Sequence, residues 1–378
     1  MSRLQVLALS PVPYEGAGCR FRISQYLPYL AAHGIDVTVA PFYDREFFGL
    51  VYEPRRYVRK AVLFMKQAAA RVIDIARAGR FDAVWVYREA LPLGPPVLEW
   101  MLSVCRRPLL YDFDDAVFLT NTSDANRYLA ALKFPGKTDW IIARADQITA
   151  GNEYLAAHAR TLNRSVQVIP TAVDTEVFVP RVDQRDAAVP PVIGWIGTPT
   201  TAPYLRMLGE PLLALTRLHP FTLRVSGGTA DSMAPDVRVE HLPWSLDREV
   251  TLFSTCEVGV YPMPDDEWAR GKSGFKAIQF MACAVPVVAS PVGINAEIIE
   301  HGVNGFLAST PDEWTRTLGL LIADPALRQR IGEAGRRTIE ARYSIRVNAP
   351  RIAAALRQTA AGVTRTTPMA HTSREPER

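Results

Sequence analysis

Two lysines four residues apart stand out as residues able to do chemistry. Lys272 and Lys276 lie at the predicted start of a helix over 275–284, after a loop with proline and glycine over 264–274. The amino end of a helix offers free backbone N–H groups and the positive end of the helix dipole, and both favour an anion. Residues four apart project from one side of a helix, so the two ammonium groups can meet on one phosphate. The pattern predicts a phosphate site; the alternative is that both lysines lie on a solvated helix face.

Two buried strands are expected to hold this helix. Continuous apolar runs over 258–263 and 286–289 flank it, so strand, loop, helix and strand form one βαβ unit with a right-handed crossover. The same alternation recurs along the chain, for example after the apolar runs at 4–10, 83–87 and 192–196. Continuous apolar strands of this kind are typical of parallel sheets. The sequence therefore predicts an α/β protein.

The length of the chain points to more than one domain. A chain of 378 residues is long enough for two domains and a tail. The segment 181–191 carries alternating charges beside prolines and is interpreted as a linker. We expect a first domain over 1–180, a second over 192–343 and a helix over 344–358. The remaining segment, 359–378, has few apolar residues to bury and is predicted to be disordered.

The segment that follows the two lysines resembles a known family. Its parts are Met281-Ala282-Cys283-Ala284, Pro286-Val287-Val288, Gly293, Glu297-Ile298-Ile299 and Gly302-Val303-Asn304-Gly305-Phe306. In this order and spacing they resemble the donor-binding segment of GT-B glycosyltransferases, especially the retaining family-4 group (glycosyl transferases group 1). The run VIPTAVDTEVF over 168–178 is similar to the interdomain signature of that family, with Thr171-Ala172 in place of the usual Asn-Gly. The resemblance implies an α/β GT-B fold with two Rossmann-like doubly wound domains facing an interdomain cleft. It also implies a C-terminal helix that returns to the N-terminal domain.

The resemblance assigns roles to residues of this chain. Lys272 and Lys276 would neutralise the departing nucleoside diphosphate, and with Asp112 they are the candidate catalytic residues. Acceptor contacts are expected from Arg20 and Asp115. The residues expected to contact the donor are Gly16, Gly18, Gly197, Thr198, Gly274, Gln279 and Glu267.

Three positions depart from the family pattern. Thr198 stands where the family often has an arginine on the diphosphate. Gly271 and Gln279 replace two glutamates, the later of which binds the ribose in the family. A glutamine can still hydrogen-bond a ribose, but without the strength of a carboxylate. Glu267 or Asp266, in the same loop, is the acid that would compensate.

The predicted strand 108–112 leads into an aromatic and acidic run, 111–115, that overlaps its end. Ligands gather at the carboxyl ends of strands in open α/β sheets, so this run is a candidate site. A metal-binding Asp-X-Asp is one interpretation. The GT-B resemblance instead favours contacts of Asp112 and Asp115 with sugar or acceptor hydroxyls and no metal. A third interpretation is that these carboxylates cap the next helix.

Bulk composition narrows the partners. A net charge of +4 over the whole chain does not indicate nucleic acid. The 4 cysteines are scattered without a CxxC or a Cys/His cluster, which is typical of reduced thiols and argues against zinc. No apolar run reaches the length of a signal peptide or a membrane span. We therefore expect a cytoplasmic protein, at most peripheral on the inner face of the membrane.

The segment 55–80 is unusually basic. It holds eight arginines and lysines against a single acid, Asp74. Its apolar residues recur at roughly helical spacing and are Val58, Val62, Met65, Val72 and Ile73. A basic amphipathic helix can lie on an anionic membrane surface. The alternative is a helix that buries these apolar residues in the core and presents a solvated basic face.

Together these patterns predict a glycosyltransferase. It would move a sugar from a UDP- or GDP-linked donor to a glycan, a lipid-linked sugar or a small molecule, with no cofactor and no metal. Two alternatives stay open, namely a GT-B nucleotide-sugar epimerase and a non-catalytic protein of nucleotide-sugar binding or assembly. The sequence does not determine the base, the sugar or the acceptor.

Overall fold

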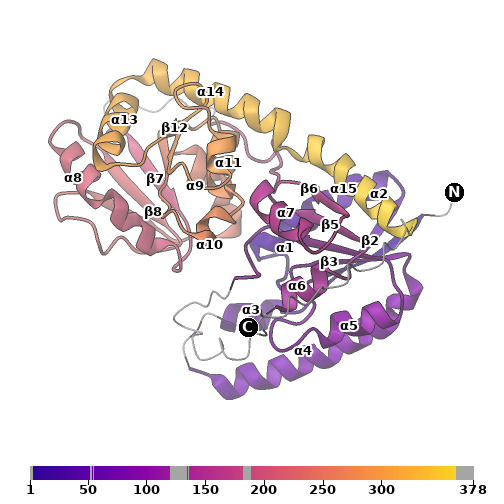
Figure 1. Cartoon of the computed structure of the whole chain (residues 1–378). Coiled ribbons are helices and arrows are strands. Elements are labelled where there is room, and N and C mark those ends of the chain that lie inside the picture. The colour runs from indigo at the N-terminus through magenta and orange to yellow at the C-terminus, as the bar shows by residue number, and fades with distance from the viewer. Residues whose placement is uncertain are drawn as a thin grey trace, which may run out of the picture.

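The computed structural model shows two parallel sheets, each flanked by helices (Figure 1). It describes residues 3–51, 53, 55–119, 134, 136–181 and 189–362. Within these residues the strand order is β2-β1-β3-β4-β5-β6 in the first sheet and β12-β11-β10-β7-β8-β9 in the second. All strand neighbours are parallel, which confirms the predicted α/β class.

The first sheet is built from short strands, of which the central ones are buried on both faces and the two edge strands are partly exposed. Its strands are β1 (Leu4–Ser10), β2 (Ile35–Pro41), β3 (Ala83–Tyr87), β4 (Leu109–Phe113), β5 (Gln147–Ala150) and β6 (Val166–Val168). Helix α1 (Ala17–Arg22) leads into η1 (Ser24–Tyr26). One face of the sheet packs on η1, α2 (Leu27–Ala32) and α15 (Ile345–Ala360). The other face packs on α4 (Tyr57–Arg77), η2 (Ala78–Arg80), α5 (Val97–Val104), α6 (Lys137–Ile142) and α7 (Glu153–Arg160). A further helix, α3 (Arg45–Val51), packs on α4.

The second sheet carries the predicted βαβ unit. Its strands are β7 (Val192–Ile196), β8 (Thr222–Ser226), β9 (Val239–Leu242), β10 (Val258–Tyr261), β11 (Val287–Ala289) and β12 (Phe306–Leu307). Its first helices are η4 (Ala202–Leu208), α8 (Gly209–Thr216), η5 (Leu246–Arg248), α9 (Glu249–Ser254) and α10 (Glu267–Arg270). They are followed by α11 (Phe275–Ala282), α12 (Asn295–Ile298), α13 (Pro311–Ala323) and α14 (Pro325–Arg342). Strand β10, helix α11 and parallel strand β11 confirm the unit proposed around Lys272.

Two stretches with a continuous helical pattern, 20–33 and 202–218, form interrupted helices. The first breaks at Ile23, whose backbone leaves the helical region at φ −125° and ψ −65°. The second is a 3₁₀ segment, η4, followed by α8. Pro28 and Pro211 lie in the first turn of the second piece in each case, where the missing proline N–H is tolerated.

Helices α14 and α15 connect the domains at their outer side (Figure 1). Ser344, which lies between these two helices, forms a parallel β-bridge with Val173 of the first domain. Helix α15 then packs on the first sheet, which confirms the predicted return of the C-terminal helix. Helix α15 continues to Ala360, so the prediction of a disordered tail from residue 359 starts that tail too early. The rest of that tail, 363–378, and linker residues 182–188 lie outside the described residues.

No helix within the described part of the chain is long and apolar enough to cross a membrane.

Candidate functional site

The amino end of α11 is the centre of the candidate site. Gly274 precedes the helix with φ +64°, a left-handed conformation that favours glycine. A Cβ there would also lie 2.7 Å from Cδ1 of Ile298. No side chain caps this end of α11, so its first N–H groups keep the direction and charge suited to an anion.

The turn before α11 contacts the first domain. The side-chain amide of Asn152 donates to the carbonyl oxygens of Gly271, at 3.2 Å, and Lys272, at 3.0 Å. Gly271 packs so closely on Ala116 that an added Cβ would lie 2.5 Å from the Ala116 Cβ. The structure therefore places the lysine-bearing turn at the interface of the two domains and not on a remote outer surface.

Lys276 lies deeper than Lys272. Its half-buried ammonium donates to Oε1 of Gln279 at 3.0 Å and lies 5.3 Å from the centre of the Phe253 ring. Burial lowers the pKa of Lys276 to about 8, an effect that Glu249 opposes and Arg20 reinforces. An arriving phosphate would stabilise the charged form of this lysine. Lys272 is half-buried too, with its Nζ 5.5 Å from the Trp268 ring centre.

A buried carboxylate, Glu249, links α11 to the first domain. Its Oε1 accepts from Nε2 of Gln279 at 3.3 Å, and its Oε2 accepts from Nη2 of Arg20 at 2.8 Å. The Arg20 guanidinium also lies over Phe21, 4.6 Å from the ring centre, and 5.9 Å from Trp244. Sequence reasoning missed Glu249 and Asn152, because each belongs to a short helix start with no motif of its own. Arg20, expected on the acceptor, is a domain-bridging residue in this structure.

Three of the expected donor residues are placed around this centre. Gln279 is fully buried and both ends of its amide are engaged, by Lys276 and Glu249, so a ribose contact stays a prediction. Glu267 is exposed in the first turn of α10, and its neighbour Asp266 caps that helix by accepting from Ala269 N at 2.7 Å. Gly274 forms the entry of α11 itself.

Gly197 and Thr198 end β7 on a threonine-rich turn. Thr198 is exposed, its N–H donates to Oγ1 of Thr201 at 3.0 Å, and its hydroxyl lies 2.7 Å from that of Thr200. A Cβ on Gly197 would lie 2.3 Å from the Trp195 ring. The glycine is thus required for packing, while the hydroxyls of the turn face solvent.

Gly16 and Gly18 are close to protein side chains in this structure. Gly18 lies inside α1, and an added Cβ would be 2.5 Å from the Tyr87 hydroxyl. An added Cβ on Gly16 would be 2.8 Å from the Val12 side chain. Gly18 is therefore part of a helix, and both glycines are packed against side chains of the first domain. Whether a donor contacts either residue stays a prediction.

The acidic run of the first domain is already paired. Asp112 is fully buried and accepts from Arg22 through both oxygens, with Nε at 3.1 Å from Oδ2, and from Thr149 at 2.6 Å. Asp114 and Asp115 both pair with Arg88, which has a left-handed backbone at φ +60°. Asp112 therefore holds Arg22 in this structure, and its expected contact with substrate stays a prediction. Among the residues that the structure describes, no three histidine, cysteine or acidic side chains gather as a metal site.

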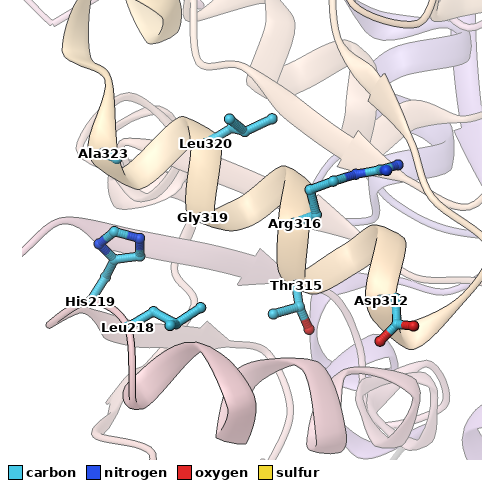
Figure 2. A pocket seen from close by; sticks show the side chains of 8 residues that line it. All are labelled: Leu218, His219, Asp312, Thr315, Arg316, Gly319, Leu320 and Ala323. Carbon is cyan, nitrogen blue, oxygen red and sulfur yellow. The ribbon is translucent and has the colours of Figure 1, made fainter.

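A hollow between α13 and the end of α8 lies away from the amino end of α11 (Figure 2). Its lining residues are Leu218, His219, Asp312, Thr315, Arg316, Gly319, Leu320 and Ala323. In Figure 1 these helices lie at the end of the second domain remote from the first. The hollow includes none of the residues expected in the site.

Known proteins of similar sequence are glycosyltransferases, and the family match falls in the second domain. Residues 190–324 match the family of glycosyl transferases group 1. The D-inositol 3-phosphate glycosyltransferase of Nocardiopsis dassonvillei is 26% identical over 235 residues, 52% of each chain. The α-maltose-1-phosphate synthase of Mycobacterium tuberculosis is 27% identical over 219 residues, 49% of this chain and 54% of that protein. The chain spans about half the length of the curated relatives it matches.

Solved structures extend the likeness to both domains. Sucrose-phosphate synthase from Thermosynechococcus elongatus aligns with a TM-score of 0.65 at 18% identity, covering 95% of this chain and 100% of that one. Anabaena HepE in complex with UDP aligns with a TM-score of 0.61 at 18% identity, covering 94% and 100%. The fold is thus the GT-B fold of glycosyltransferases. Within it, residues 190–324 match the glycosyl transferases group 1 model, in agreement with the predicted resemblance to glycosyltransferases.

Proposed function

We propose that this protein transfers a sugar from a nucleotide-diphosphate donor to an acceptor. The observation that carries the proposal is the uncapped amino end of α11, with Lys272 and Lys276 beside it at the domain interface. Relatives named as glycosyltransferases and a structural neighbour solved with UDP-glucose support the same substrate class. The donor is UDP- or GDP-linked, and the transfer retains the anomeric configuration as in family 4.

The chemistry proposed for this chain is electrostatic. The diphosphate would lie on the N–H groups of α11, with the two ammonium groups neutralising the charge that develops on the departing nucleoside diphosphate. Donors held in place before the reaction stabilise that charge without reorganisation. Two lysines and a helix end can supply this stabilisation without a metal ion. Contact between the domains would exclude water and favour transfer over hydrolysis.

Acceptor contacts are proposed for the face of the first domain that meets α11. Asp115 pairs with Arg88 at the end of β4, and Arg20 reaches Glu249 of the second domain. These groups suit hydroxyls of a glycan, a lipid-linked sugar or a small molecule. Their existing ion pairs would hold them in position before the acceptor arrives.

The test is a set of three single variants assayed with labelled UDP- and GDP-sugars. Lys272→Ala and Lys276→Ala are expected to lower turnover by about 10²–10³-fold, the usual effect of removing one preorganised donor. Arg330→Ala, which removes an exposed cation of α14 outside both proposed surfaces, is the control and should behave like the wild type. Turnover at the wild-type level in Lys272→Ala would remove the assigned role.

Incubation with the donor alone separates the remaining functions. A transferase hydrolyses the donor slowly and needs an acceptor for full turnover. An epimerase would change the sugar without an acceptor, and a non-catalytic protein would bind UDP or GDP without turnover. A thermal-shift series over UDP, GDP, ADP and dTDP identifies the base, because ligand bound only by the folded state raises its stability.

A second proposal concerns the outer face of α4, which we infer lies on an anionic membrane at its inner face. The apolar residues of this helix are exposed, by 80% at Val58, 63% at Val62 and 67% at Met65. Val72 and Ile73 continue this exposed stripe. The alternative that these residues face the core is therefore wrong.

The buried side of α4 explains how the helix is held with its apolar stripe outward. Arg71 is buried there and donates to the carbonyl oxygens of Ala40, at 2.8 Å, and Ser10, at 3.1 Å, which end β2 and β1. Exposed basic residues flank the stripe, including Lys66 and Arg77. An apolar stripe with basic flanks matches a bilayer surface that is apolar inside and anionic outside.

Vesicle binding tests this surface. Lys66→Glu/Arg77→Glu/Arg80→Glu should weaken binding to phosphatidylserine-containing vesicles about 100-fold or more at low salt, since each cation contributes about 1 kcal/mol. Arg330→Glu/Arg337→Glu/Arg346→Glu is the control, because it makes the same charge change at exposed positions of α14 and α15. Equal loss in both triples, or binding to neutral vesicles alone, would contradict the proposal.

A further inference from the structure

Asn152 divides its hydrogen bonds between the two domains. It is 2% exposed and precedes α7, where its Oδ1 accepts from Leu155 N at 2.9 Å and so caps the helix. The other end of the same amide donates to the carbonyl oxygens of Gly271 and Lys272 in the second domain. One side chain of the first domain thus fixes the turn that carries Lys272.

Capping alone does not explain an asparagine at this position. Aspartate and serine cap helices about as well, because each offers an oxygen to the N–H groups of the first turn. Only an amide accepts on one side and donates two hydrogens on the other. The donating half of Asn152 is used entirely on the second domain, so the choice of residue fits an interdomain role.

The surroundings restrict the same turn from a second direction. Gly271 packs on Ala116 of the first domain, where an added Cβ would also lie 3.0 Å from the Ala116 backbone nitrogen. Ala116 follows β4 and Asn152 follows β5, two neighbouring strands of one sheet. The first domain therefore holds the turn through both shape and hydrogen bonds.

We propose that Asn152 is a positioning residue that couples contact between the domains to the orientation of Lys272 and α11. Its two bonds to Gly271 and Lys272 exist only while the domains are together, so they favour that arrangement over one in which the domains separate. Without them the turn is free to reorient and the domains spend less time together. The inference rests on the proposed function only for its effect on turnover.

Asn163 provides a matched control within the first domain. Its amide donates to the carbonyl oxygens of Ile142, at 2.7 Å, and Ala145, at 2.8 Å, and its Oδ1 accepts from Ser165 N at 2.8 Å. The chemistry is the same as at Asn152, but no bond leaves the domain. Asn163→Asp therefore reports the structural cost of placing a carboxylate against two carbonyl oxygens.

The experiment compares Asn152→Asp, Asn152→Ser and Asn163→Asp in the full chain. Spin labels on exposed Cys105 of the first domain and on Leu320→Cys of α13 report the interdomain distance. Thermal unfolding, UDP affinity and turnover are measured beside it. Aspartate and serine at 152 keep the cap, so α7 is preserved while the bonds to the second domain are lost.

Asn152→Asp is expected to broaden the distance distribution toward larger values and to lower kcat/KM about 30-fold, since two hydrogen bonds are lost and a carboxylate faces two carbonyls. UDP affinity should fall less than kcat/KM does, because only Lys272 is reoriented while the UDP contacts proposed for Lys276 and the amino end of α11 stay within the second domain. Asn152→Ser should show a smaller effect in the same direction. Asn163→Asp should lower the unfolding temperature and leave the distances unchanged.

An unchanged distance distribution in Asn152→Asp would overturn the inference, as would an equal change in Asn163→Asp. The distances and UDP affinity need no turnover. If the distances shift while the wild type turns over no sugar donor, the proposed function fails and the positioning role stands.

Discussion

The charged groups at the ends of β4 and at the start of α11 differ in how they are paired. In the first domain, Asp112 is fully buried against Arg22, and Asp114 and Asp115 share Arg88. In the second, the Lys276 ammonium donates to the neutral amide of Gln279. No ion pair of Lys272 or Lys276 is present among the residues that the structure describes. Charges that neutralise one another hold the fold, whereas cations with neutral partners keep their charge for a ligand.

The largest expected effect follows from breaking the buried ion pair between Asp112 and Arg22. Asp112→Ala leaves the buried Arg22 guanidinium without its carboxylate and should lower the free energy of unfolding by about 3–5 kcal/mol. Chemical denaturation measures the change. Asp36→Ala, which removes the exposed partner of Arg3, is the control and should change stability little. A small effect of Asp112→Ala would mean that the pair is not structural.

The next prediction concerns the lysines at the start of α11 and follows from the pKa of Lys276. The unfolded chain keeps the Lys276 proton up to its ordinary pKa of 10.5, whereas the folded chain releases it near 8. Stability therefore rises with pH between about 8 and 10.5, because the unfolded state binds more protons there, and Lys276→Met should abolish this rise. UDP affinity should fall over the same range, since the ammonium loses its charge. Unfolding and calorimetric titration at several pH values measure both.

A substitution at Glu249 is expected to shift the pH range in which Lys276 loses its charge. Glu249 raises the pKa of Lys276 against the larger effect of burial, so Glu249→Gln should shift the loss of UDP affinity to lower pH. The size of the shift separates the influence of Glu249 from that of burial. If the midpoint stays in place, Glu249 acts only through its bond with Arg20, and the comparison of paired with unpaired charges would weaken.

The smallest expected effect concerns the turn beside the site. Asp266 caps α10, so Asp266→Ala should cost about 1 kcal/mol of stability. Asp324→Ala, which removes a similar cap from α14, is the control for stability alone. Lower UDP affinity in Asp266→Ala only would show that α10 helps to hold the lysine-bearing turn.

Much of the fold followed from local pattern. Continuous apolar runs predicted β1, β3 and β7 with their observed bounds, because a strand buried on both faces needs apolar side chains throughout. The start of α11 followed from Gly274 and the spacing of the lysines. The orientation of α4 was not predictable, since its apolar stripe is the same whether it faces the core or solvent. The burial of Leu63, Arg71 and Ile75 on the opposite side decides between them.

The sequence by itself determined the βαβ units, the family resemblance and the helix start beside which two lysines lie, because these depend on residues that are neighbours in the chain. The tertiary structure alone decided which groups surround that helix end. Asn152 lies 119 residues before Gly271, and Arg20 lies 229 residues before Glu249. Hydrogen bonds over such separations form only after two domains have folded and come together, and no local pattern of residue types encodes them.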